Sequence, residues 1–296
     1  MKDKIGNLIS VTFFPVWMLI TILGSAYMIT IGIAETYVVT LFFGVSCFLI
    51  LFLERQFPFN KEWNKSQQDV KTDLAHFVFS AGVTVTVLRA IIYVPLFLIA
   101  SYLSTVFSFD LWPSEWPLIV QFTIAVVIVD FFTYWVHRFM HEVDFLWRIH
   151  SVHHSPNRLY SFNSVRVHPI ETSLFYFCQT GTLVLLGAPV ELLALFTSFI
   201  GVSSLLQHCN VNINYGILNW LVSTSVLHRW HHSTVVKEAL NYGDNLIIWD
   251  LVFKTYYLPD TNGPKKLGPD EAITNYPKGY LDQLIVPFRW TKYIGK

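Results

Sequence analysis

The chain has 296 residues, of which 53% are hydrophobic and only 14% are charged, and its mean hydropathy is +0.45. Soluble domains carry about 25% charged residues, so this composition is typical of a membrane protein. A formal net charge of zero gives no support for nucleic-acid binding, and Cys47, Cys178 and Cys209 lack the spacing of a disulfide framework or a thiolate zinc site.

Apolar segments long enough to enter a membrane make up much of the chain, since about 20 apolar residues cross the hydrocarbon core. Four of them are predicted to be spans, namely residues 5–34, 36–53, 74–103 and 117–136. The first is too long for a signal peptide and lacks its cleavage site. A fifth, residues 172–206, is interrupted by Gly187-Ala188-Pro189. We expect it to form a helical hairpin that dips into the bilayer and returns.

Basic residues predict the orientation, because cytoplasmic loops are enriched in Lys and Arg. The loop at residues 54–73 carries four of them (Arg55, Lys61, Lys65 and Lys71), whereas the loop at residues 107–116 has two acidic residues and no basic one. We therefore expect a cytosolic N-terminus, with the chain returning to the cytosol at His137 and staying there after residue 206. On this map, Arg89 is the only Lys or Arg placed away from the cytoplasm and its interface.

Three histidine clusters lie at this membrane boundary. They are HxxxH (His137, His141), HxxHH (His150, His153, His154) and a second HxxHH (His228, His231, His232), while His168 and His208 stand alone. A lone histidine such as His76 is usually a core residue with satisfied hydrogen bonds. Eight clustered rings would repel one another when protonated, and each needs two partners when neutral and buried. They favour two metal ions with three to five nitrogen ligands each.

Imidazole ligands suit zinc, iron, copper and nickel, so ligand type alone leaves the metal open. The sequence contains neither the HExxH of a zincin protease nor the ExxH of a carboxylate-bridged di-iron bundle.

The order HRFMH, HSVHH and HRWHH resembles the histidine boxes of the sterol desaturase/fatty acid hydroxylase superfamily. The context is similar too: DFFTYWVHR (residues 130–138) precedes the first box, His168-Pro169 lies downstream, and NYGDNLIIWDLVFKT (residues 241–255) follows the last. The resemblance covers about residues 130–288. It implies two Fe ions, with His168 and His208 as additional ligands or near-ligands. Zinc is an alternative occupant after purification.

The resemblance also implies an enzyme that uses O2 and an external reductant to hydroxylate or desaturate a C–H bond of a lipid. The substrate is left open between a sterol, an acyl chain, a glyceryl ether lipid and a carotenoid-like molecule. No HPGG stretch of a fused cytochrome b5 module is present, so we expect a separate electron-donor protein.

Asp130 is the predicted catalytic carboxylate. It precedes His137 by seven residues, which puts both on one helix face, and a carboxylate inside a span is costly and usually functional. We expect it to accept the second N–H of a ligating histidine. A pairing with Arg89 or Arg138 that only orients helices is the alternative. Asn241, Asp244 and Asp250 are candidates to anchor the last box, or simply turn residues.

The predicted fold is all-α. It is a bundle of about four transmembrane helices plus the re-entrant hairpin, capped by a cytosolic, helical, histidine-rich region. Residues 1–130, 131–260 and 261–296 form its membrane, catalytic and interfacial parts, and residues 275–290 are expected to lie on the cytoplasmic bilayer surface.

Two other classes of function compete with the lipid oxygenase. A metal transporter would place its histidines within the spans, whereas these fall almost entirely outside them. A haem protein would present axial histidines on facing spans rather than in clusters. A glyceryl-ether monooxygenase is an alternative within the same superfamily.

Overall fold

The computed structural model describes residues 2–108, 110–261, 263–270, 273 and 275–293. Within these residues the protein is helical and has no β-strand, only isolated bridges. Five helices are long and apolar enough to cross a membrane. The predicted all-α membrane fold is therefore confirmed. The predicted division at residues 130 and 260 stays a prediction, and part of the segment 261–296 lies outside the described residues.

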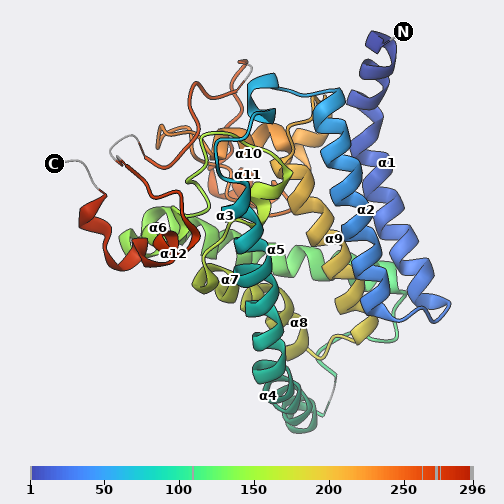
Figure 1. Cartoon of the computed structure of the whole chain (residues 1–296). Coiled ribbons are helices and arrows are strands. Elements are labelled where there is room, and N and C mark those ends of the chain that lie inside the picture. Colours follow the sequence, from blue (N-terminus) through green and yellow to red (C-terminus); the bar gives the residue numbers. More distant parts are fainter. Residues whose placement is uncertain (1, 109, 262, 271–272, 274, 294–296) are drawn as a thin grey trace.

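Helices α1 (Lys2–Thr30), α2 (Glu35–Gln56) and α9 (Val190–His208) run side by side (Figure 1). The most apolar window of α9 is 67% buried, against 22% and 28% for α1 and α2, so α9 is the central helix. Gly24 lets α1 approach α2 closely, because a Cβ there would lie 2.7 Å from the Phe42 ring.

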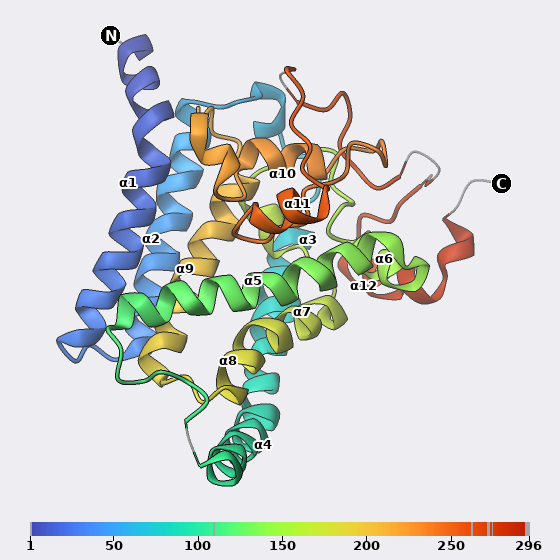
Figure 2. The same cartoon turned by 180° about the vertical axis from the view of Figure 1, so that it is seen from behind.

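One continuous helix forms the opposite wall. It consists of α3 (Val70–Ala75), the π-helical η2 (His76–Val83) and α4 (Thr84–Phe107). Only 6% of its most apolar window is buried, so most of its apolar surface is available to lipid. Helix α5 (Leu118–Glu142) runs across the bundle instead of along it, as Figure 2 shows.

The predicted hairpin is present as helices α7 (Pro169–Tyr176), η4 (Phe177–Gly181) and α8 (Thr182–Leu185), a turn, and α9. Gly187 makes the turn with φ +82°, a left-handed conformation that favours glycine. The returning arm, α9, is longer than a short re-entrant arm, since it is itself one of the five candidate spans.

Short helices form a cap that covers the bundle towards the end where α1 begins and extends down one side of it, where α6 and α12 lie (Figure 1). They are η1 (Lys61–Asn64), α6 (Asp144–His150), η3 (Ser161–Val165), η5 (Gly216–Trp220), α10 (Ser225–His231), α11 (Ile248–Phe253), α12 (Tyr280–Ile285), η6 (Val286–Phe288) and η7 (Trp290–Lys292). Two buried ion pairs, Arg158–Asp69 and Arg166–Asp73, join the loop before η3 and the loop after it to the start of the α3–α4 wall.

His76 is a core residue, as predicted. Its Nδ1 contacts the Ser80 hydroxyl and the Val167 backbone carbonyl, and its Nε2 contacts the side-chain amide oxygen Oε1 of Gln283 at 2.9 Å. The last of these contacts fixes α12 against η2. On the other side of the tail, Leu281, Ile285 and Phe288 remain exposed, in keeping with the predicted position at a bilayer surface.

Candidate metal centre

Four elements bring the histidines together. Helix α5 presents His137 and His141 four residues apart, on one face. Helix α6 and the turn after it carry His150, His153 and His154, helix α9 ends at His208, and α10 and its C-cap carry His228, His231 and His232. Side chains from segments far apart in the sequence therefore converge at the junction of the cap and the membrane helices.

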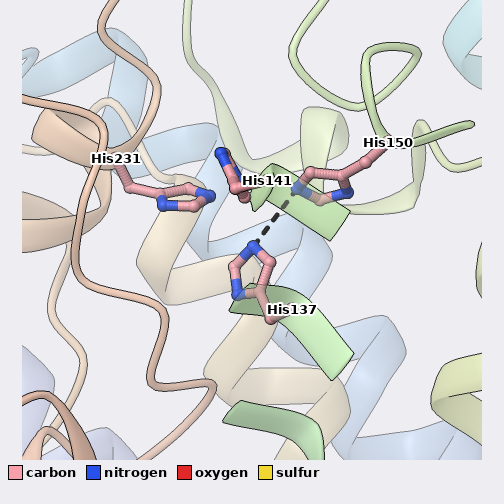
Figure 3. Close-up of side chains that lie close together, drawn as sticks. All are labelled: His137, His141, His150 and His231. Atoms are coloured by element: carbon pink, nitrogen blue, oxygen red, sulfur yellow. Dashed lines mark hydrogen bonds between the residues drawn. The ribbon is translucent and has the colours of Figure 1, made fainter. Parts of the chain in front are cut away.

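The rings form two groups, in each of which one ligand atom per residue lies within 4.8 Å of all the others. The first group is His137, His141, His150 and His231, and the second is His153, His208, His228 and His232. Figure 3 shows the first group converging from three separate segments. His154 lies against it, with its Nε2 3.1 Å from that of His150 and 3.2 Å from that of His231.

Hydrogen bonds at Nδ1 fix the direction of five of these rings. Each Nδ1 faces an oxygen: Tyr242 O for His137, Glu171 Oε1 for His150, Arg166 O for His153, Ser204 O for His208 and Leu240 O for His231, over 2.8–3.2 Å. A backbone carbonyl or an ionised carboxylate only accepts, so a ring bonded to either donates its Nδ1–H. A neutral imidazole has one N–H, so the Nε2 of such a ring carries a lone pair.

These lone pairs face one another. The Nε2 atoms of His137 and His150 are 3.2 Å apart in the first group, and those of His153 and His208 are 3.1 Å apart in the second. Two acceptors at this distance repel unless a cation lies between or beside them. Protonating one ring of each pair would also relieve the repulsion, but it is unfavourable because burial and neighbouring histidines lower the pKa of His150 and of His153. The residues therefore fit bound metal ions.

His141 gives a second, independent indication that the first group fits a bound cation. Its Nε2 is buried and has no hydrogen-bond partner among the described residues. A buried polar atom without a partner costs about 1–3 kcal/mol, so natural proteins seldom leave one unpaired. A metal ion in the first group would give this nitrogen a partner.

Two of the predicted site residues lie outside the two histidine groups. His168 belongs to neither group, because it begins helix α7. Its Nδ1 accepts from the Ile170 N–H at 3.1 Å, and its Nε2 donates to the Leu284 carbonyl at 3.2 Å. Both ring nitrogens therefore have backbone partners, and the ligand role that the resemblance implies for His168 stays a prediction.

Asp130 is buried, but none of its hydrogen bonds with described residues goes to a histidine, to Arg89 or to Arg138. Its carboxylate accepts from the backbone N–H groups of Asn245 and Leu246, at 2.6 and 3.1 Å, and from the Asn245 side chain. The structure thus gives Asp130 the role of holding the loop after the last histidine box.

The carboxylate that does orient a ring is Glu171, which the sequence analysis missed. It lies on α7, three residues after His168, and is 2% exposed. A charged residue inside an apolar helix was the available signal. The carbonyls of Leu240 and Tyr242 were also missed, because a backbone oxygen leaves no mark in a sequence.

Asp250 holds the loop that supplies one of these carbonyls. Its two carboxylate oxygens each accept a backbone N–H at 2.7 Å, one from Tyr242 and the other from Gly243. Gly243 is required at this point, since a Cβ would lie 2.2 Å from the Leu246 carbonyl oxygen. Of the two roles left open for Asp250, these hydrogen bonds fit the anchoring of the loop after the last histidine box. The Tyr242 carbonyl of that loop in turn bonds His137.

A cavity of about 480 Å³ opens beside both groups. One end is lined by five of the rings (His137, His150, His153, His208 and His228), and the walls are largely apolar (Val39, Phe43, Phe77, Val85, Phe175 and Ile200). The cavity can therefore place an apolar molecule next to the candidate metal ligands.

Comparisons with known proteins agree with this site. Residues 122–255 match the fatty acid hydroxylase family. The chain is 38% identical over 247 residues to the ornithine lipid hydroxylase OlsE of Rhizobium tropici, covering 81% of this chain and 72% of that protein. It is 31% identical to the alkylglycerol monooxygenase of Homo sapiens over 49% of this chain and 32% of that protein. The methylsterol monooxygenase 2-2 of Arabidopsis thaliana is 28% identical over 50% of this chain and 56% of that protein. No solved structure matches the chain significantly.

Apolar helices joined to clustered, inward-facing histidines define a membrane protein with a candidate metal centre. The chain belongs to the fatty acid hydroxylase family, within the sterol desaturase/fatty acid hydroxylase superfamily, as predicted. It is an oxidoreductase of the lipid hydroxylase and monooxygenase type. The metal-transporter alternative is not favoured.

Proposed function

We propose that this protein is a membrane-bound di-iron oxygenase that hydroxylates a lipid C–H bond with O2 and electrons from an external reductant. Desaturation of the same bond is the second outcome that such a centre allows. The observation that carries the proposal is that each histidine group holds two Nε2 atoms whose lone pairs face each other, beside an apolar cavity. Two iron ions bound there would supply the oxidising chemistry.

The protein's own residues prepare the site in three ways. His137, His141, His150 and His231 would hold one ion, and His153, His208, His228 and His232 the other, with His154 beside the first group. Glu171 and the carbonyls of the 240–242 loop fix ring directions before any ion binds, which reduces the cost of ordering the ligands. The apolar cavity wall keeps water away from a bound lipid chain.

The relatives suggest the kind of substrate. Among those named above, the ornithine lipid hydroxylase aligns over the largest share of both chains, so a polar acyl lipid of this kind is our first candidate. Ether lipids and sterols are the alternatives, from the alkylglycerol and methylsterol monooxygenases.

We further propose that the N-terminus and the histidine groups face the cytosol, where a separate electron-donor protein would reach them. The basic loop between α2 and α3 supports this orientation, and the N-terminal end of α1 lies at the same end of the bundle as the cap (Figure 1).

Lipid analysis tests the proposed function. Cells that lack other hydroxylases of this family would express the wild-type chain or the His137→Ala variant, and total lipids would be compared by mass spectrometry. We expect a lipid class that gains one oxygen atom, or loses two hydrogen atoms, only with the wild-type chain. Identical lipid profiles, with both proteins present in the membrane, would contradict the proposal.

A further inference from the structure

Arg89 lies where two cavities meet. The first is the cavity beside the histidines, and the second, of about 710 Å³, extends away from it towards Glu35 and Val190 at the other end of the bundle. Both are lined by Val39 of α2, Arg89 of α4, Tyr176 of α7, Thr180 of η4 and Thr197 of α9. The two cavities thus adjoin at the Arg89 guanidinium, and together we call them the passage that runs along the membrane helices to the candidate metal centre.

Among the described residues, no carboxylate lies within ion-pairing distance of Arg89, and its guanidinium instead contacts the Tyr176 hydroxyl. Glu171 and Asp244 line only the first cavity, and Glu35 lines only the second.

An arginine without a carboxylate partner among the described residues is costly in the middle of an apolar helix. Arg89 lies near the middle of the apolar helix Val70–Phe107, and charged groups inside a span are rare unless they bind an ion, a substrate or a partner charge. Arginine also presents several N–H donors in a fork that matches a carboxylate or a phosphate group. The hydroxyls of Tyr176 and Thr180 line the same place and can donate to the same anion.

We propose that Arg89, together with Tyr176, binds the anionic group, a carboxylate or a phosphate, of the lipid that enters this passage. This inference rests on the proposed function in taking that lipid to be the substrate. The first cavity extends from Arg89 to the histidine rings between the apolar side chains Phe77, Val85 and Ile200. A lipid held at Arg89 by its anion therefore places an adjoining apolar portion next to the metal ligands.

Binding of matched charged and uncharged probes tests the inference. The purified full-length chain, in phosphatidylcholine nanodiscs, would be titrated with radiolabelled oleate and oleyl alcohol, and with hexadecyl phosphate and hexadecanol. We expect Arg89→Gln to weaken binding of the preferred anion about tenfold or more, because one charge-assisted contact is lost, and to leave the matching alcohol unchanged. Arg89→Lys should retain part of the preference.

Lys71→Gln is the matched control, since Lys71 is a cation of the same continuous helix that lines neither cavity. It should bind all probes as the wild type does. Comparison of the two anions distinguishes a carboxylate from a phosphate headgroup. Competition by inorganic phosphate tests for a free ion, and equal binding of phosphate with and without its alkyl chain would overturn the lipid assignment.

Two further results would overturn the inference. One is a wild-type protein with no preference for anion over alcohol, and the other is an Arg89→Gln variant that loses both probes equally. Iron content and lipid oxidation are measured separately on the same samples. If Arg89→Gln loses only the anion and the wild-type protein binds no iron, the anion site is supported and the proposed function fails. If the protein binds iron and oxidises lipid but shows no preference for the anion, the proposed function is supported and the anion site fails.

Discussion

Glu171 accepts a hydrogen bond from Nδ1 of His150 over 2.8 Å, and both side chains are buried. This contact turns the Nε2 of His150 towards His137 and so helps to build the first histidine group. Carboxylates that orient a ligating histidine typically contribute a factor of about 10–100 in metal affinity.

We therefore predict that Glu171→Gln lowers iron affinity about 10- to 100-fold, since the amide keeps the shape but loses the charge. Competition with a chelator of known affinity measures this change. Glu142→Gln is the control, because Glu142 pairs with Arg138 at the surface. Equal iron affinity in wild type and Glu171→Gln would show that the carboxylate does not support the site.

His231, which the histidine clusters predict as a ligand, and His168, which only the resemblance implies, should behave differently. Removing His231 takes one nitrogen from the first group, so His231→Ala should lose iron and activity while the protein still inserts into the membrane. His168→Ala should keep wild-type iron content and lose about 1 kcal/mol of stability, because His168 caps α7. The iron content of each variant, measured after extraction from the membrane, tests both predictions. An iron-deficient His168→Ala variant would show that His168 is a ligand.

Asp130 is predicted to position a loop. In Asp130→Asn, an amide N–H₂ replaces one of the two oxygens that now accept from Asn245 and Leu246, so a buried donor loses its acceptor. We expect a loss of about 1–3 kcal/mol in stability. Iron should still bind at low temperature. Unfolding in detergent followed by Trp fluorescence gives the stability, and a fully stable variant without iron would restore Asp130 to the metal site.

Asp244 makes stability depend on pH. Burial raises its pKa from 3.8 to about 6, so the folded protein holds this proton more tightly than the unfolded chain does. The stabilisation is therefore complete below the unfolded value and is lost as the pH rises through about 6. We predict that the melting temperature of wild type relative to Asp244→Asn falls between about pH 4 and pH 7. A constant difference across this range would contradict the assignment.

The sequence predicts the helices well because their length and apolarity follow directly from the thickness of the bilayer. The helical break at Gly187 and the three histidine boxes are equally local features, and the structure contains both. The predicted membrane bundle and family follow from such features, which need no knowledge of the tertiary arrangement.

Partners across the fold are what the sequence does not reveal. A spacing of seven residues places Asp130 and His137 on one face of α5, yet Asp130 meets the 245–246 backbone and His137 meets the Tyr242 carbonyl. Helix periodicity says which way a side chain points, whereas the packing of distant loops decides what it contacts. The same holds for His168, whose ring nitrogens form hydrogen bonds with backbone groups of its own helix and of the C-terminal tail.

The most direct test of a two-metal histidine centre is a metal count joined to iron K-edge X-ray absorption on protein purified without oxygen. We predict about two iron ions per chain, bound by nitrogen ligands, with roughly one lost from His137→Ala and the other from His153→Ala. A wild-type protein that binds no iron when supplied with it, or whose iron remains after both substitutions, would contradict this account.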